Sequence, residues 1–168
     1  MRVAVLTISD RSFRGEREDR GGPAVATSAV RLLPDAEIVW TKVLPDEIPE
    51  IEREIARLAD TDAADLVLTT GGTGLSPRDV TPQATLAAGD IEVPGLGEAM
   101  RAATRAAFPA ASLSRQTAVV RGRTLIVNLP GSPSGAVECL EVVASVLPHA
   151  VATLRGAAFA HPVRVDRA

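Results

Sequence analysis

The sequence contains little of what several classes of protein depend on. Aromatic residues make up only 2% of the 168-residue chain and tyrosine is absent, which argues against a platform that stacks nucleic-acid bases. The formal net charge is -3, so the chain lacks the basic footprint of a protein that grips nucleic acid. No apolar run approaches the length of a membrane span. We therefore expect neither nucleic acid nor a membrane as a partner.

Cysteine is nearly absent as well. The single Cys139 rules out a disulfide within the chain. The opening MRVAVLTISD has an apolar run too short for a secretory signal, and it has no small-residue cleavage site. Together these features lead us to expect a cytoplasmic protein. Cys139 itself falls in an amphipathic pattern, which predicts a small core residue.

What the chain does contain is the composition of an ordinary globular protein, with 46% hydrophobic and 23% charged residues. Its length predicts a single domain over residues 1–168. Residues 3–8 are rich in Val, Leu and Ile and alternate little, which is typical of a buried parallel strand. We expect strands at residues 3–8, 37–44, 65–70, 118–121 and 124–128, of which the last two form a hairpin around Gly122 near the C-terminal side.

Helical signals separate these strands. Apolar residues recur at helical spacing from Ile48 to Leu58, and Thr81–Pro82 and Ser132–Pro133 each combine an N-cap hydroxyl with a proline at the first helical position. We expect helices at residues 23–33, 46–60 and 94–108 and after Thr81 and Ser132, with the last divided by Pro148 and ended by Gly156, and an exposed loop at residues 12–22. This alternation predicts a three-layer α/β/α fold with a mostly parallel central sheet. Ligands of such folds bind beyond the carboxyl ends of the strands.

The turn Gly71-Gly72-Thr73-Gly74 follows one of the expected strands. Glycines let the backbone approach a ligand closely, and successive amides form a nest for which phosphate is the natural guest. The standard nucleotide signatures are missing, because no Walker A lysine follows and Pro77 stands at the last place of a G-x-G-x-x-G pattern. From these residues alone, a phosphate cradle and a simple tight turn between strand and helix both remain open.

Two aspartates in these loops have a chemical and a structural interpretation. Asp79 could hold a metal or a developing charge near the nest, or it could be an exposed loop acid paired with Arg78. Asp46 stands where a helix N-cap belongs, and capping alone would explain it. Capping and catalysis are compatible, because both place an oxygen at the positive end of a helix.

Polar residues in the neighbouring loops are further candidates. Ser9 and Asp10 follow the first strand and could bind a ligand, or Asp10 could simply begin the exposed loop. Ser114 and Arg115 offer a hydroxyl and a guanidinium group that suit a phosphate. The turn NLPGSP at residues 128–133 brings Ser132 and the amides of a helix start, although good turn chemistry also explains it.

Taken together, these stretches resemble the Mog/MoaB-type molybdopterin adenylyltransferases of molybdenum cofactor biosynthesis. The shared motifs are VLTISDR, DRGGP, VLPDE, LVLTTGGTGLSPRDVTPQAT, VPGLGEAMR, LSR and TLIVNLPGSP, in the family's order and over nearly the whole chain. The long central motif is the most specific of them. The chain departs from the family at Gly21, where serine is common, and at Gln83, where an acid is frequent.

The resemblance implies an α/β/α subunit that forms a homotrimer. It implies transfer of AMP from ATP to the phosphate of molybdopterin, with Mg²⁺, release of pyrophosphate, and passage of the product to a molybdenum insertase. The family's catalytic and metal-holding aspartates fall on Asp46 and Asp79. The implied phosphate-binding residues are Gly71, Gly72, Thr73, Gly74, Ser9 and Ser132, and the implied molybdopterin-binding residues are Ser114 and Arg115.

Three other functions compete with this hypothesis. The chain could be a catalytically idle molybdopterin-binding trimer that acts as a carrier or scaffold, although it keeps the R-D-V-T-P element that some inactive relatives lose. It could be another phosphate-handling enzyme on the same fold, such as the domain of CinA-type nucleotide hydrolases, but NLPGSP and the short length do not support this. A nucleic-acid module is disfavoured by the charge and the aromatic content.

Overall fold

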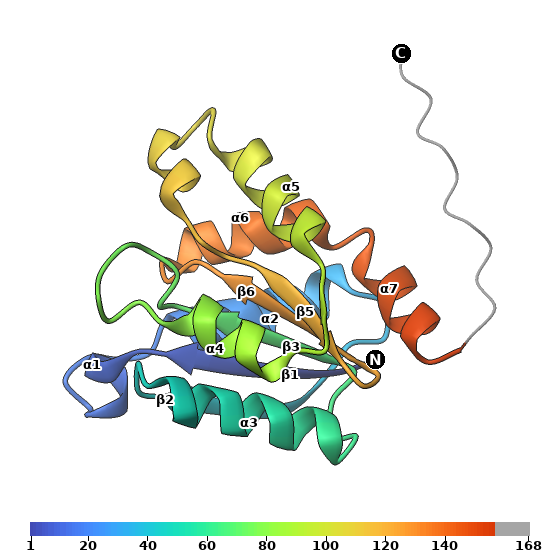
Figure 1. The fold of residues 1–168 in the computed structure, drawn as a ribbon. Coiled ribbons are helices and arrows are strands. Elements are labelled where there is room, and N and C mark those ends of the chain that lie inside the picture. The colour runs from blue at the N-terminus through green and yellow to red at the C-terminus, as the bar shows by residue number, and fades with distance from the viewer. Residues whose placement is uncertain (157–168) are drawn as a thin grey trace.

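The computed structural model describes residues 1–156 and shows a six-stranded sheet with helices on both faces (Figure 1). The spatial order of the strands is β2-β1-β3-β6-β5-β4. The first four of these are parallel, whereas β5 is antiparallel to both β6 and β4. The strands are β1 (Arg2–Ile8), β2 (Glu37–Leu44), β3 (Leu66–Thr70), β4 (Ile91–Glu92), β5 (Ala118–Arg121) and β6 (Thr124–Leu129). The predicted parallel sheet and hairpin are confirmed, and only the short β4 was not expected.

The helices form two outer layers. Helices α3 and α4 pack together on one face of the sheet, and α2, α5, α6 and α7 cover the other (Figure 1). They are α1 (Asp10–Phe13), α2 (Gly21–Leu32), α3 (Ile48–Asp60), α4 (Thr81–Ala88), α5 (Pro94–Thr104), α6 (Pro133–Val143) and α7 (Leu147–Leu154), with a 3-10 helix, η1, at Pro109–Leu113. The predicted three-layer arrangement is therefore confirmed.

Burial on both faces explains the apolar character of the central strands. In β3, Leu66 and Leu68 belong to the core beneath α2 and α6, whereas Val67 belongs to the core beneath α3 and α4. Successive side chains of a strand point to opposite faces, so a strand covered on both sides reads as a continuous apolar run. Cys139 is also a core residue, as its helical pattern predicted, with only 4% of its surface exposed.

Several element boundaries differ from the sequence expectations. The expected loop at residues 12–22 contains the end of α1 and the start of α2, and α1 forms because the Ser9 hydroxyl accepts a hydrogen bond from the Ser12 amide at 3.2 Å. Helix α5 ends at Thr104 rather than at residue 108. Phe108 is not helical, because the residue before a proline is disfavoured in helical conformation, and Pro109 then opens η1.

The C-terminal helix is divided, as expected, but the break precedes Pro148. Helix α6 ends at Val143 and α7 begins at Leu147, and the two helices are bent by 65°. Proline cannot donate a hydrogen bond to the carbonyl group four residues earlier, so Pro148 leaves the carbonyl of Ala144 without that partner. Gly156 follows α7 with a φ of +73°, the left-handed conformation that commonly ends a helix.

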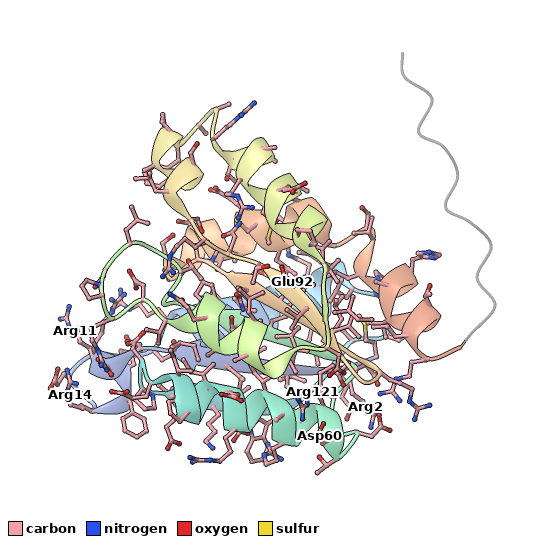
Figure 2. All side chains as sticks on the ribbon, in the orientation of Figure 1. Arg2, Arg11, Arg14, Asp60, Glu92 and Arg121 are labelled. Carbon is pink, nitrogen blue, oxygen red and sulfur yellow. The ribbon has the colours of Figure 1, made fainter. Side chains whose placement is uncertain are left out.

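Charged side chains lie at both ends of the sheet (Figure 2). Where the parallel strands begin, Arg121 pairs with Asp60 at 2.7 Å and Arg2 pairs with Asp65 at 2.7 Å. Arg11, in α1, and Arg14, which caps the end of α1, lie at the opposite end, beyond the carboxyl ends of the parallel strands. In the part of the chain that the structure describes, no single helix is long and apolar enough to cross a membrane, and α6 and α7 meet those criteria only as a bent pair.

Candidate active site

The carboxyl ends of the parallel strands converge at one edge of the sheet. The Ser9 amide donates to the carbonyl of Leu44 at 2.9 Å and joins the ends of β1 and β2. The Gly71 amide donates to the carbonyl of Leu129 at 3.2 Å, and the Thr70 hydroxyl donates to the carbonyl of Pro130 at 2.8 Å. These bonds join the loops in two pairs, and the parallel pairing of β1 with β3 places the two pairs side by side.

The carbonyl groups of the turn Gly71–Gly74 all accept hydrogen bonds from the protein. Thr81 donates from its hydroxyl to Gly71 at 2.9 Å and from its amide to Gly72 at 3.1 Å. Arg115 donates from its amide to Thr73 at 2.9 Å and from Nε to Gly74 at 2.7 Å. By contrast, the amides of residues 72–74 donate to no group within residues 1–156. The turn therefore offers three successive amides to an anion.

Glycine is required at the first two positions of this turn. Gly71 has a φ of +106°, and a Cβ atom there would lie 2.2 Å from the carbonyl oxygen of Ile8. Gly72 has a φ of +63°, and its Cβ would lie 2.3 Å from the Thr81 hydroxyl oxygen. The prediction that Thr81 caps α4 is wrong, because Val80 is the N-cap and Thr81 is the first helical residue. The Thr81 hydroxyl fixes the turn instead of the helix end.

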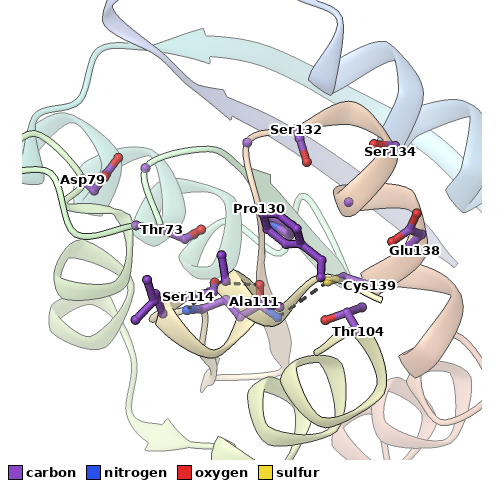
Figure 3. A pocket seen from close by; sticks show the side chains of 18 of the residues that line it. Thr73, Asp79, Thr104, Ala111, Ser114, Pro130, Ser132, Ser134, Glu138 and Cys139 are labelled. Carbon is purple, nitrogen blue, oxygen red and sulfur yellow. Dashed lines mark hydrogen bonds between the residues drawn. The ribbon is translucent and has the colours of Figure 1, made fainter. Parts of the chain in front are cut away.

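Two hollows flank the turn, and Gly72, Asp79 and Gly131 line both of them. The large cavity has a volume of about 760 Å³ and is shown in Figure 3. Its other lining residues include Thr73, Gly74, Thr104, Phe108, Leu113, Ser114, Gln116, Ser132, Glu138 and Cys139. The small hollow has a volume of about 210 Å³, and its other lining residues include Thr7, Ser9, Arg17, Asp19, Asp46 and Gly71.

Asp79 lies where the two hollows meet. Its Oδ2 accepts a hydrogen bond from the Ser76 amide at 2.8 Å, and its own amide donates to the Ser76 carbonyl at 2.9 Å. The alternative of an Arg78–Asp79 pair is wrong, because Arg78 turns away and pairs with Asp10 at 2.8 Å and Glu47 at 3.0 Å. Within residues 1–156, Oδ1 of Asp79 accepts no hydrogen bond. One carboxylate oxygen is thus fixed by the backbone and the other is available.

Asp46 is held in a similar way by Asp10. Oδ2 of Asp46 accepts a hydrogen bond from the Asp10 amide at 2.7 Å, and Oδ1 of Asp10 accepts one from the Asp46 amide at 3.0 Å. The prediction that Asp46 caps a helix is wrong, because α3 begins at Ile48 with Glu47 as its N-cap. The Asp46 carboxylate thus bonds to the loop that follows β1 and not to the start of α3. Its Oδ1 lies 3.1 Å from the place that a Cβ on Gly72 would take.

The surroundings give these carboxyl groups different proton affinities. Burial raises the pKa of Asp46, and the charges of Asp10 and Asp79 act in the same direction, against the Asp10 amide and Arg78. Burial also acts to raise the pKa of Asp10, but hydrogen bonds from the Asp46 amide and from Arg78 outweigh it, and the net pKa is lowered. The protein thus keeps Asp46 as a carboxylate only against an electrostatic cost.

We expect Asp46→Asn to be more thermostable than the wild type at neutral pH. The pKa of Asp46 is higher in the folded chain than in the unfolded chain. At a pH between these two pKa values, the folded chain therefore binds more protons than the unfolded chain. Stability from this group therefore falls as pH rises through that interval, and the loss persists above it. Melting curves of both proteins from pH 4 to pH 8 should show an advantage of the variant that grows with pH. A variant that melts lower at pH 8 would contradict the assignment.

Asp46 and Asp79 have the donor set that a magnesium ion accepts. Residues 1–156 contain no group of three or more His, Cys, Asp or Glu side chains placed to hold a metal. Magnesium, however, is usually held by one or two carboxylates together with substrate phosphates and water. Both aspartates line the small hollow, and each has one oxygen without a hydrogen bond from the described chain. These residues therefore fit a magnesium ion that arrives with a phosphate ligand.

Of the remaining predicted site residues, three line one of the two hollows and the fourth bonds to main-chain carbonyls. Ser9 lines the small hollow, and Ser132 lines the large cavity as the N-cap of α6, the position that the sequence predicted. Ser114 also lines the large cavity, and its hydroxyl donates to Oε1 of Gln116 at 3.0 Å. Arg115 differs from them, because its guanidinium group donates to main-chain carbonyls of the neighbouring loop.

The chain matches known proteins over most of its length. Residues 4–149 match the family model described as a probable molybdopterin binding domain. The chain belongs to this molybdopterin-binding family. It is 44% identical over 143 residues to the molybdopterin adenylyltransferase of Haemophilus influenzae, which covers 85% of this chain and 73% of that protein. It is 39% identical over 154 residues to the molybdopterin adenylyltransferase of Helicobacter pylori, which covers 92% and 88%.

A solved structure agrees with this assignment. The molybdopterin biosynthesis enzyme MoaB from Thermus thermophilus has a TM-score of 0.84 and 50% sequence identity to this molybdopterin-binding domain. The alignment covers 92% of this chain and 96% of that structure. The family resemblance expected from the motifs is therefore confirmed, together with the fold.

The sequence reasoning missed some residues that the molybdopterin-binding domain brings to its site. Asp19 lines the small hollow, where it accepts hydrogen bonds from the Thr7 hydroxyl at 2.8 Å and the Gly22 amide at 3.0 Å. Asp19 lies one residue before Arg20, the N-cap of α2, in a segment expected to be a loop, so no local pattern marked it. Glu138 lines the large cavity from the middle of α6, and no local pattern distinguished it from an exposed helical acid.

Proposed function

We propose that this chain transfers AMP from ATP to the phosphate of molybdopterin and releases pyrophosphate. The observation that carries the proposal is the turn Gly71–Gly74, with three successive amides that have no partner in residues 1–156 and lie beside Asp46 and Asp79. Such a turn suits phosphate groups. The names of the H. influenzae and H. pylori relatives, both molybdopterin adenylyltransferases, support the same activity.

Two hollows that meet at one turn suit a reaction between two phosphate-bearing substrates. We assign molybdopterin to the large cavity, whose volume of about 760 Å³ lies in the range of small-molecule sites. Ser114 offers a hydroxyl group there, and so does Ser132, which the family resemblance placed with the phosphate-binding residues. We assign the phosphates of ATP to the small hollow, whose lining includes Arg17, Asp46 and Gly71. The attacking phosphate and the α-phosphate of ATP then meet at Gly72 and Asp79, which line both hollows.

The chemistry requires two anions to approach each other. The amides of residues 72–74 are oriented before the substrates arrive, so they can offset part of the repulsion without reorganisation. Asp46 and Asp79 would hold Mg²⁺, which when bound supplies positive charge to the phosphates and the leaving pyrophosphate. Most of the rate enhancement would come from positioning and electrostatic stabilisation, because no covalent step on the protein is needed.

Other features implied by the family stay predictions. They are the homotrimer, the molybdenum insertase as recipient of the product, and the cytoplasmic location. A catalytically idle carrier that binds molybdopterin remains the second candidate, because a cavity and an amide cradle would serve binding as well as transfer. Turnover separates the two functions.

We expect the purified chain to convert molybdopterin and ATP to adenylylated molybdopterin and pyrophosphate in the presence of Mg²⁺, and to stop when the metal is chelated. Sedimentation of the same preparation should show a trimer. Molybdopterin binding without turnover would favour the carrier, and no binding of either substrate would contradict both functions. A purely monomeric species at micromolar concentration would argue against the trimer.

A further inference from the structure

The amides of residues 72–74 form what we call the amide cradle. The segment Gly74–Asp79 connects this cradle to the start of α4, and it carries the carboxylate of Asp79. Leu75, Ser76, Pro77 and Arg78 are all exposed, so the segment buries little apolar surface of its own. Within it, the Ser76 amide donates to Asp79 and the Asp79 amide donates back to Ser76. These local bonds close a turn but do not fix the turn relative to the cradle.

Arg115 provides that fixation from a distant part of the chain. It follows η1 and precedes β5, and it is half-buried. Its Nε donates to the carbonyl of Gly74 at 2.7 Å, and its Nη2 donates to the carbonyl of Asp79. Its amide donates to the carbonyl of Thr73 at 2.9 Å. One side chain thus bonds to both ends of the segment, while its backbone bonds to the cradle.

The chemistry of the guanidinium group suits this task. Its donors lie in one plane at fixed angles, so two carbonyl groups held by one guanidinium cannot move independently. A lysine ammonium group has no such geometry. Arg78 also ties the segment to the rest of the protein, but its partners are the carboxylates of Asp10 and Glu47, and its own side chain is 53% exposed. Ion pairs with an exposed partner stabilise weakly. Thr81 bonds to Gly71 and Gly72 but lies beyond the segment. Arg115 is therefore the residue that bonds directly to both ends of the segment.

We propose that Arg115 is a positioning residue, which clamps both ends of the segment Gly74–Asp79 and so sets the place of the Asp79 carboxylate relative to the amides of residues 72–74. This inference rests on the proposed adenylyl transfer. It differs from the role that the family resemblance implied, a contact with molybdopterin. The three hydrogen bonds of Arg115 all go to main-chain carbonyls, and the residues that line the large cavity include Ser114 and Gln116 on either side of it but not Arg115.

The test compares Arg115→Ala and Arg115→Lys with Arg123→Ala, an exposed arginine in the hairpin turn at the opposite end of the sheet. We expect amide hydrogen exchange in residues 75–79 to quicken about tenfold in both Arg115 variants and to be unchanged in the control. We expect kcat to fall about a hundredfold, as for a misplaced catalytic group. The affinity for molybdopterin without ATP should stay within about twofold. Low millimolar guanidinium should restore part of the kcat of Arg115→Ala and none of that of Arg115→Lys, whose side chain occupies the site.

Each outcome decides for or against the clamp. Unchanged exchange in residues 75–79 would overturn the proposal whatever the activity, and so would faster exchange with normal kcat. A loss of molybdopterin affinity of about tenfold or more, with unchanged exchange, would restore the ligand-contact role. If Arg115→Ala does not fold, Arg115→Lys carries the same comparison. Exchange is measured without turnover, so an inactive wild-type protein would refute the proposed function while the exchange result still decided whether the clamp exists.

Discussion

Asp79→Asn is expected to lower adenylyl transfer at least about a hundredfold, which corresponds to a barrier increase of roughly 2.7 kcal/mol. Asparagine keeps the shape of the side chain and an oxygen that can accept the Ser76 amide, so the local turn should survive. It removes the negative charge that the proposed mechanism places beside the metal and the reacting phosphates. The melting temperature should therefore change little while the rate collapses, as measured by formation of adenylylated molybdopterin.

Asp90→Asn is a matched control for this substitution. Asp90 also accepts a turn amide at 2.8 Å, from Gly122, but it lies at the hairpin edge of the sheet. Its substitution should leave the transfer rate unchanged. If Asp46 and Asp79 act as one metal-handling unit, the double asparagine variant should be little slower than either single variant. Near-normal transfer by a folded Asp79→Asn protein would remove Asp79 from the mechanism.

Gly71→Ala is expected to destabilise the fold by at least about 3 kcal/mol, a combination of backbone strain and steric overlap. Gly71 has a φ of +106°, and an added Cβ would lie 2.2 Å from the carbonyl oxygen of Ile8, which is backbone and cannot turn aside. For a domain of this size the melting temperature should fall by roughly 6–12 °C. Thermal unfolding followed by circular dichroism measures the effect directly.

Gly122→Ala separates the two causes. Gly122 also has a positive φ, +55°, but an added Cβ there would have no atom within 4 Å. This control should cost only about 1 kcal/mol, the penalty of a left-handed residue without a clash. Equal losses in the two variants would mean that the approach of β3 to the end of β1 does not constrain position 71.

The sequence was informative where a local pattern has one physical cause. The apolar run at residues 3–8 predicted a buried parallel strand, and the spacing from Ile48 to Leu58 predicted α3, because burial alone sets those patterns. The glycines of residues 71–74 predicted either a phosphate cradle or a tight turn, because only a close ligand or a positive φ requires glycine there. The loops after the strands were expected to meet because the strands are parallel.

The partners of individual polar groups were not predictable in the same way. Asp46 and Thr81 both stand where a helix cap is common, yet their oxygens bond to Asp10 and Gly71, which are remote in sequence. Arg115 donates to carbonyls about forty residues away. Every residue has a backbone carbonyl, so the sequence does not indicate which one an arginine will bond to. The hydrogen-bond partners of these groups are set by which residues the fold brings close together, and this overrides the local preference for helix capping.

The bonding of the turn Gly71–Gly74 also fixes the sign of charge that it accepts. A peptide plane can rotate by half a turn and exchange an outward amide for an outward carbonyl, which would convert an anion cradle into a cation site. Here each such flip would break a hydrogen bond donated by Thr81 or Arg115. The cradle is thus polarised in one direction, and it should reject alkali cations while it accepts oxyanions as different as sulfate and vanadate.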